Sequence, residues 1–361
     1  MKHQRWIAAI LALTVVAGLG LAKKKKKKDE EPVTQTLPVL QDPPAAIVTD
    51  TQSLVFRVAP LSAKGLLSQQ VRDGLKALIQ GSRGATIVKL RAFVAGTGDL
   101  RRVQTIVSEL FAERRLPMPA LSTIQGGALP GEGVQVAIEA IEAQKKPANP
   151  AGIAFISGQA GAGVDESIGH LRTVLKSRGL ADSSVQMVSC FVSSLDNYSA
   201  VRQSIAAAFP PAAINVVQMQ RTPVKTAIEC EAAATLVRPP SARIELANPD
   251  GLPRSPNYSQ VALAGPGRLV ITGIQLGFGT EEKDTRLAFE RLGRALTGVQ
   301  SGFPEVFYTR MYPVSDLAAE AIRTVRFKFL DQSRPPASTL LPFEAMQSLD
   351  ASFGVEVMAA K

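Results

Sequence analysis

The order of predicted strands and helices repeats three times along the chain, and this repeat constrains the fold more than any other feature. In the first passage a strand begins at Leu54, an amphipathic helical segment follows, a second strand begins at Ile87, and Asp99 is placed to cap a second helix. A proline-led turn and a closing strand, "MPALSTIQGGALPGEGVQVAIEAIE", complete the passage. The same order returns from Ile153 and from Leu269, so the sequence indicates a triplicated unit.

The spacing inside the three passages supports this interpretation. The first and second strands begin 33, 32 and 36 residues apart, and Asp99, Asp196 and Asp316 follow the second strand by 12, 11 and 11 residues. Pro-, Gly- and Asn-containing joints separate the passages at 143–150 and 238–256. We therefore predict domains at 51–143, 151–236 and 252–361.

The predicted fold class is α+β. A unit of several strands and two helices usually places both helices on one face of its sheet, and this leaves an apolar second face that must be buried. Three units in one chain can bury these faces against one another, as a pseudo-threefold ring with central sheets and outer helices. Covalent linkage gives an effective concentration of about a millimolar, so we expect a monomer.

The N-terminus has the layout of a secretory signal. A basic start, an apolar stretch over Trp6–Ala22 and small residues suited to cleavage make up residues 1–22. An uncleaved membrane anchor is the alternative, because Lys23–Lys28 opposes export. Residues 23–50 are a lysine run and a proline-rich tether. We expect an exported or envelope protein that meets the membrane only through this segment.

Charge and residue usage exclude several function classes. The first 31 residues supply half of the formal charge of +10, and the remaining chain has no dense basic cluster with interleaved aromatics, so no nucleic-acid partner is expected. Only His3 and His170 are present, which rules out a histidine-based triad or a histidine-rich metal site. The glycines of "GQAGAG" lack dinucleotide-binding spacing. No cofactor is expected.

Several stretches resemble one known family. The second passage contains "FISGQ", "LKSRGLADSSVQMVSCFVSSLDNYSAV" and "RTPVKTAIECEAAA", the third contains "PNYSQVALAGPGRLVITG", and the first contains "PAL" and "LPGEGVQVAIEAIE". These resemble the reactive intermediate deaminase family, the RidA-like proteins also called L-PSP endoribonucleases. The resemblance implies a chorismate-mutase-like unit assembled as a trimer, with small-molecule clefts between neighbours.

The resemblance also implies two functional residues. In active members an arginine after the Pro-Ala of the turn holds the substrate carboxylate, and a glutamate of the closing strand positions water for imine hydrolysis. The arginine position holds Leu121, Ile214 (or Ala213, if the gap is placed differently) and Ser338, so the cation is absent from all three units. Glu139 and Glu231 match the glutamate, and Met358 occupies the third position. Because strands alternate faces, we favour solvent-facing glutamates without a catalytic role.

Other family positions have simpler interpretations beside the functional one. Tyr258 matches a cleft tyrosine, but it could equally be a packing residue. Gly158 and Gly273 match a ligand-facing glycine, although we favour a bulge or hairpin. Cys190 and Cys230 lie on strands that the family places side by side; a disulfide is possible after export, and two buried thiols are favoured.

Two functions remain in play. The first, which we favour, is a catalytically degenerate binding or interaction module. The second is an enamine or imine hydrolase that uses Glu139 or Glu231 with a replacement cation from Arg91, Arg310 or Arg334, although solvent-facing arginines are the simpler interpretation. A guanidinium that converges on a cleft beside Leu121, Ile214 or Ser338 would distinguish the two.

Overall fold

The structure is a computed structural model that describes residues 40–96, 99–221 and 228–361. The predicted export segment and most of the tether lie outside these residues. Pro38–Lys361 belongs to one compact unit. No helix in the described part of the chain is both long enough and apolar enough to span a membrane.

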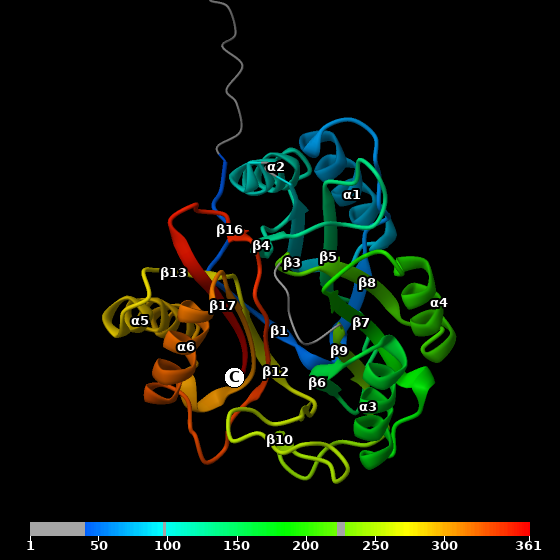
Figure 1. Cartoon of the computed structure of the whole chain (residues 1–361), viewed down its shortest axis with the longest axis vertical. Helices are drawn as coiled ribbons and strands as arrows, with labels where there is room; N and C mark the ends of the chain where they lie inside the picture. Colours follow the sequence, from blue (N-terminus) through cyan, green and yellow to red (C-terminus); the bar gives the residue numbers. More distant parts are fainter. Residues whose placement is uncertain (1–39, 97–98, 222–227) are drawn as a thin grey trace, which may run out of the picture. The chain divides into compact units, whose positions relative to one another are not determined.

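The first sheet contains five strands in the order β16-β4-β3-β5-β2, with two helices beside it (Figure 1). Only β3 and β4 run parallel. The elements are β2 (Leu54–Val58), α1 (Leu67–Gly81), β3 (Thr86–Ala95), α2 (Leu100–Glu113), β4 (Ala120–Gly126), β5 (Val136–Ala143) and, from near the C-terminus, β16 (Ala345–Met346).

The second sheet contains six strands in the order β10-β11-β6-β9-β7-β8. The elements are β6 (Ile153–Gly161), α3 (Val164–Ser177), β7 (Val185–Val192), α4 (Tyr198–Ala208), β8 (Ala213–Gln218), β9 (Ile228–Thr235), β10 (Ile244–Ala247) and β11 (Val261–Ala264).

The third sheet has the order β1-β12-β17-β14-β15, and β13 also pairs with β17. The elements are β1 (Ala46–Asp50), β12 (Arg268–Thr272), β13 (Gln275–Phe278), α5 (Glu282–Gly298), β14 (Val306–Pro313), α6 (Asp316–Val325), β15 (Ala337–Leu340) and β17 (Ala351–Ala360). Short 3-10 helices lie at Thr51–Ser53, Asp182–Ser184, Phe303–Glu305 and Arg326–Lys328.

Strand pairing crosses the predicted domain boundaries. β1 precedes the first unit but pairs with β12 of the third sheet, and β11, inside the predicted third domain, pairs with β6 of the second sheet. A mixed α+β chain with three sheets and a repeated element order agrees with the predicted fold class.

Helix caps follow the prediction in one unit and shift in the other two. Asp99 caps α2 by accepting a hydrogen bond from the Arg101 amide. The caps predicted at Asp196 and Asp316 are wrong, because Asn197 and Ser315 hold these positions. The Ser315 hydroxyl accepts a hydrogen bond from the Ala318 amide. Asp316 therefore lies in the first turn, where its negative charge interacts favourably with the helix dipole.

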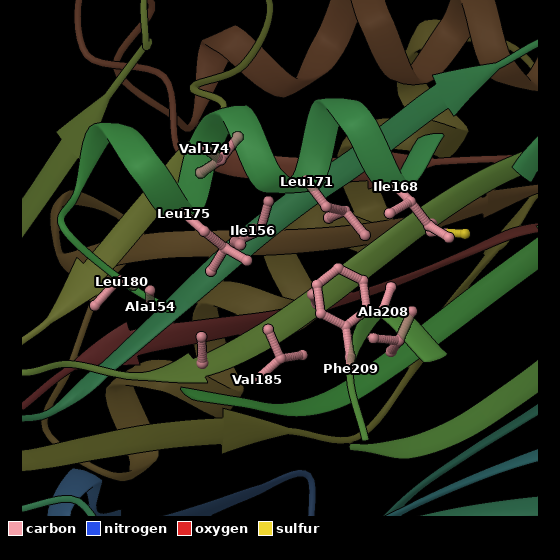
Figure 2. Packing of buried hydrophobic residues seen from close by; sticks show 14 of the residues in the cluster. Ala154, Ile156, Ile168, Leu171, Val174, Leu175, Leu180, Val185, Ala208 and Phe209 are labelled. Atoms are coloured by element: carbon pink, nitrogen blue, oxygen red, sulfur yellow. The ribbon is translucent and has the colours of Figure 1, made fainter. Parts of the chain in front are cut away.

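Each sheet packs one face against its own helices. Figure 2 shows this for the second sheet, where Leu171 and Leu175 of α3 lie over Ala154 and Ile156 of β6 in a buried cluster. The apolar positions recur every three or four residues along α3, so one helical face is buried. Equivalent clusters lie between α1, α2 and the first sheet and between α5, α6 and the third.

The opposite faces of the sheets contribute to a shared core. A further buried cluster contains Ile141 from the first sheet, Phe155 from the second, and Ile271 and Tyr308 from the third. The ring centroids of Phe155 and Tyr308 are 5.7 Å apart. Apolar side chains of all three sheets are therefore buried against one another.

Candidate functional site

The strand registers identify equivalent positions in the three units. Leu121, Ile214 and Ser338 occupy the same step of β4, β8 and β15, opposite Leu90, Val188 and Thr309. This register favours Ile214 over Ala213 as the counterpart of the other two. None of the three side chains carries a charge, as the sequence comparison of the units predicts.

The register also corrects the assignment of the third glutamate. Glu139 pairs with Arg91, and Glu231 pairs with Ser189. In the third sheet Glu356, not Met358, pairs with the corresponding residue, Arg310. The prediction for Met358 was two residues out of register, because "GVEVMAA" contains a single glutamate and offers little other guide to the alignment.

The three glutamates meet in one buried ion network. Arg91 Nε donates to Glu139 Oε2 at 2.6 Å, and Arg91 Nη2 donates to Glu231 Oε1 at 2.7 Å. Arg310 Nε also donates to Glu231 Oε1, at 2.8 Å, and Lys89 Nζ donates to Glu356 Oε2 at 2.6 Å. Three cations thus balance three carboxylates contributed by all three sheets.

Neutral side chains complete the network. Ser189 Oγ and Asn215 Nδ2 donate to Glu139 Oε1 at 2.8 and 2.7 Å. The Tyr308 hydroxyl donates to Glu231 Oε2 at 3.0 Å, and the Tyr312 hydroxyl donates to Glu356 Oε1 at 2.9 Å. Every one of these carboxylates therefore has several charged or polar partners.

The protonation states follow from this pairing. Burial would raise the pKa of Glu356, but Lys89 and Arg310 hold that pKa at about 2. Burial opposes ionisation of Glu231 in the same way, and Arg310 and Arg91 outweigh it, so its pKa is lowered. Burial lowers the pKa of Lys89, an effect that Glu356 offsets only in part.

The predicted solvent-facing positions of Glu139, Glu231, Arg91 and Arg310 are wrong. Glu139 and Glu231 are only 5% and 2% exposed, because partners from other units satisfy their charges. The cavity beside the network has a volume of about 30 Å³, which is space for about two or three water molecules. These carboxylates are therefore enclosed in the network and have no room beside them for an organic substrate.

A separate pocket lies between the second and third sheets. It has a volume of about 260 Å³ and brings together three of the predicted cleft residues, Gly158, Tyr258 and Ser338. Glu229, Arg323 and Arg326 also line it, and we call it the Glu229 pocket. Two hydrogen bonds hold its walls together: Gly158 N donates to Thr339 Oγ1 at 3.2 Å, and Ser338 N donates to Ser157 Oγ at 2.9 Å.

Glu229 is an unusual carboxyl group. Loss of hydration on burial, and then repulsion from Glu231, raise its pKa to about 8, so it is protonated at neutral pH. The pKa of Tyr258 is also raised, mainly by burial and to a smaller extent by the negative charge of Glu229. A Cβ at Gly158 would lie 1.8 Å from Glu229 Oε1, so only glycine leaves space for this carboxyl. Gly158 also lies where β6 shifts register, as the predicted bulge requires.

Arg326 contributes a buried cation to this pocket. It is 3% exposed, and its Nε has no hydrogen-bond partner among the described residues. Burial, and then repulsion from Arg323, lower its pKa to about 10, which leaves it charged at neutral pH. Its guanidinium lies 4.7 Å from the Phe327 ring centroid. Sequence reasoning missed this residue, because it lies outside the family motifs.

The other two equivalent clefts differ from the Glu229 pocket. Ile214 lines a pocket of about 410 Å³ together with Val58, Ala59 and Arg202. Beside Leu121, Ile274 N donates to Leu121 O at 3.1 Å, and both side chains are buried. Gly273 N donates to Ala45 O, and Ser157 N donates to Gln260 O at the equivalent point of the second sheet. Gly273 is therefore the structural counterpart of Ser157, and the predicted match of Gly273 with Gly158 is wrong.

Two further expectations are corrected. Cys190 and Cys230 are directly opposed on β7 and β9 and form a disulfide, so the favoured free thiols are wrong. Cys190 and Cys230 alternate with Ser189 and Glu231, which face the buried ion network, so both cysteine side chains point into the apolar layer on the opposite face of the sheet. Arg334 Nη2 donates to Ile244 O at 2.9 Å and lines a different pocket, so it supplies no cation beside Ser338.

No family model matches the sequence, and no curated protein matches it. Solved structures do match. A member of the YjgF/YER057c/UK114 family from Mycobacterium tuberculosis is 21% identical, covers 33% of this chain and 99% of its own, and gives a TM-score of 0.24. YyfB, of the Rid family, from Yersinia pestis is 18% identical over 33% and 100% of the chains, with a TM-score of 0.29. A putative endoribonuclease L-PSP from Entamoeba histolytica is 17% identical over 33% and 99%, with a TM-score of 0.24.

These matches concern the fold alone. Each spans about a third of this chain and almost all of the other protein, which is the extent of one repeated unit. These solved structures are RidA-like proteins, the family that the sequence resembles. What the pockets do has to be argued from the residues of this chain.

Proposed function

We propose that the chain is an intramolecular pseudo-trimer of RidA-like units that binds a small organic anion in the Glu229 pocket. Contacts around the three clefts support the arrangement. Gly158 of the second unit meets Thr339 of the third, and Ile274 of the third meets Leu121 of the first. Val58 and Ile214, of the first and second units, line a shared pocket.

The observation that carries the ligand class is Arg326, a buried cation whose Nε has no hydrogen-bond partner among the described residues. A buried guanidinium without a carboxylate partner among the described residues is costly unless an anion completes it. Protonated Glu229 and the Tyr258 hydroxyl can donate hydrogen bonds to the same anion. Arg326 would thus supply, from the end of α6, the charge that the turn position Ser338 lacks.

Standard imine hydrolysis is the less supported function. The two glutamates proposed for it, Glu139 and Glu231, are occupied by Arg91 and Arg310 in the central network. Glu139 is held in one ion pair and Glu231 in two, and a carboxylate held in this way is a poor base for activating water. We therefore keep the degenerate binding module as the proposed function, without a cofactor or a nucleic-acid partner.

The proposal includes export. The leader at 1–22 has the features of a signal peptide, with a membrane anchor as the alternative. The Cys190–Cys230 disulfide supports an oxidising compartment, where such bonds persist. Fractionation of cells that express the full chain, followed by N-terminal sequencing of the mature protein, tests both points.

Binding of benzoate, compared with neutral benzamide, tests the proposed ligand class by calorimetry. Benzoate should bind at pH 7 and benzamide should not. Arg326→Gln should weaken benzoate binding at least about tenfold, since the loss of one partner of a buried charge pair costs about 2 to 5 kcal/mol. Arg172→Gln is the control, because Arg172 pairs with Asp182 at the surface and does not line the pocket; we expect less than about a threefold change.

The pH dependence gives a second test of the same pocket. Above pH 8 Glu229 ionises and repels the bound anion, so benzoate affinity should fall between pH 7 and pH 9. Glu229→Gln should remove this fall. Equal affinity for benzoate and benzamide, or an unchanged affinity in Arg326→Gln, would show that the pocket does not select anions.

A further inference from the structure

The strands that precede the repeated units pair outside their own unit. β1 precedes β2 but pairs with β12, and β11 precedes β12 but pairs with β6. The joint before the second unit, residues 144–152, contains no strand. As a consequence the outer edge of β2 has no paired strand among the described residues, and we call this edge the β2 slot.

The main chain of β2 is oriented for pairing on that edge. Ala59 N donates to Ile138 O and Gln144 N donates to Ser53 O, both at 2.8 Å, so the odd-numbered positions of β2 bond to β5. In an antiparallel ladder the alternate residues then direct their N–H and C=O groups to the other side. These are Leu54, Phe56 and Val58. Leu54 N donates to Thr51 O and Leu54 O accepts from Asn149 Nδ2, whereas no hydrogen bond from a described residue reaches the outward groups of Phe56 and Val58.

The equivalent positions in the other sheets are covered. Phe56, Phe155 and Ile271 correspond, because they pair with Ile141, Ala233 and Met358 of the closing strands. Phe155 and Ile271 pair with residues of β11 and β1 and are 1% exposed. Phe56 and Val58 pack against the shared core but stay partly exposed. An apolar strand edge with free main-chain groups is a template for another strand.

The first unit has no described strand equivalent to β11, and this absence also accounts for the larger pocket beside Ile214. In the second unit the residues ahead of β11 continue along β6, and Tyr258 among them lines the Glu229 pocket of about 260 Å³. No described segment takes this place beside β2, and the pocket there is about 410 Å³. The slot and this pocket together match the path of one extended segment.

We propose that the β2 slot binds an extended peptide segment of a partner protein as an added antiparallel strand. Small apolar residues at alternate positions would face Phe56 and Val58, as Ala262 and Ala264 of β11 face the shared core. The residues ahead of the strand would enter the pocket lined by Ile214. This proposal rests on strand pairing and is independent of anion binding at Arg326.

Amide hydrogen exchange of the full chain, followed by NMR, tests the proposal. In the free protein the amides of Phe56 and Val58 should exchange rapidly, while those of Phe155 and Ile271 are protected. The probe is a synthetic peptide, SPNYSQVALAGP, which copies residues 255–266. Its addition should slow exchange at Phe56 and Val58 at least about tenfold.

Two variants of one residue separate pairing from packing. Val58→Pro removes an outward N–H and leaves the β5 ladder intact, so it should abolish peptide binding. Val58→Ala keeps the N–H and should bind within about threefold of the parent chain. A peptide with proline in place of the alanine that copies Ala262 should not bind to the parent chain or to either Val58 variant.

Three results would overturn the proposal. Protected amides at Phe56 and Val58 in the free chain would mean that residues 1–39 or a second copy already cover the edge. Unchanged exchange on addition of the peptide would mean that the edge does not accept a strand. Equal binding to Val58→Pro and Val58→Ala would mean that the peptide binds elsewhere.

Discussion

Glu229→Gln should make the protein more stable at alkaline pH. Burial raises the pKa of Glu229 from 4.5 to about 8, so the folded state holds a proton that the unfolded state releases. The free energy of unfolding therefore falls as pH rises from about 4.5 to about 8. At 1.36 kcal/mol per pKa unit the full shift corresponds to about 5 kcal/mol, and partial solvent access to the side chain reduces this to about 2 to 5 kcal/mol.

Urea unfolding at pH 4.5, 7 and 9 measures this effect. The parent chain and Glu229→Gln should be equally stable at pH 4.5, because glutamine resembles the protonated carboxyl in shape and hydrogen bonding. At pH 9 the variant should be the more stable by the stated amount. Glu245→Gln is the control, since Glu245 is already paired with Arg178 at 3.0 Å and should not become more stable when neutralised. Parallel pH profiles for parent and Glu229→Gln would refute the argument.

Three other perturbations have defined outcomes. Gly158→Ala should lower the free energy of unfolding in urea by about 1 to 3 kcal/mol, because the new Cβ displaces the Glu229 carboxyl. Gly163→Ala is the control and should change little, because no atom lies within 4 Å of its Cβ. Equal effects of the two substitutions would contradict this. Replacing both cysteines by alanine removes a link across 40 residues and should cost about 4 kcal/mol, and a loss below 1 kcal/mol would argue against the disulfide. Ammonia release from a freshly generated imine of a small amino acid should not exceed the buffer rate, and Leu121→Arg should not restore it; turnover lost on Glu231→Gln would reverse the functional assignment.

Local patterns predicted the repeated units well. Hydrophobic periodicity and turn residues lie within each passage, so the order strand, helix, strand, helix and the Asp99 cap were accessible from neighbouring residues alone. The alignment of the three turn positions was correct for the same reason, as the shared register of Leu121 and Ser338 shows.

Features that depend on distant partners were not predictable. Arg91 looks like a surface residue until Glu231, 140 positions away, is placed beside it. The pairing of β1 with β12 needs the positions of two units at once. For Lys89 and Arg91 a signal existed, since they alternate within an otherwise apolar strand and so point to one face. Arg326 carried no such signal, because its burial depends on the fold around it.

The coupling energy between Arg91 and Glu231 tests the central claim most directly, namely that separate units pack together around the ion network. The measurement is a double-mutant cycle of Arg91→Met, Glu231→Gln and the combined variant, by urea unfolding at pH 7. The two residues lie on β3 and β9 with atoms 2.7 Å apart, so we predict a coupling of about 2 kcal/mol or more. Additive effects within about 0.5 kcal/mol would mean that the two units do not meet there, and would contradict the account.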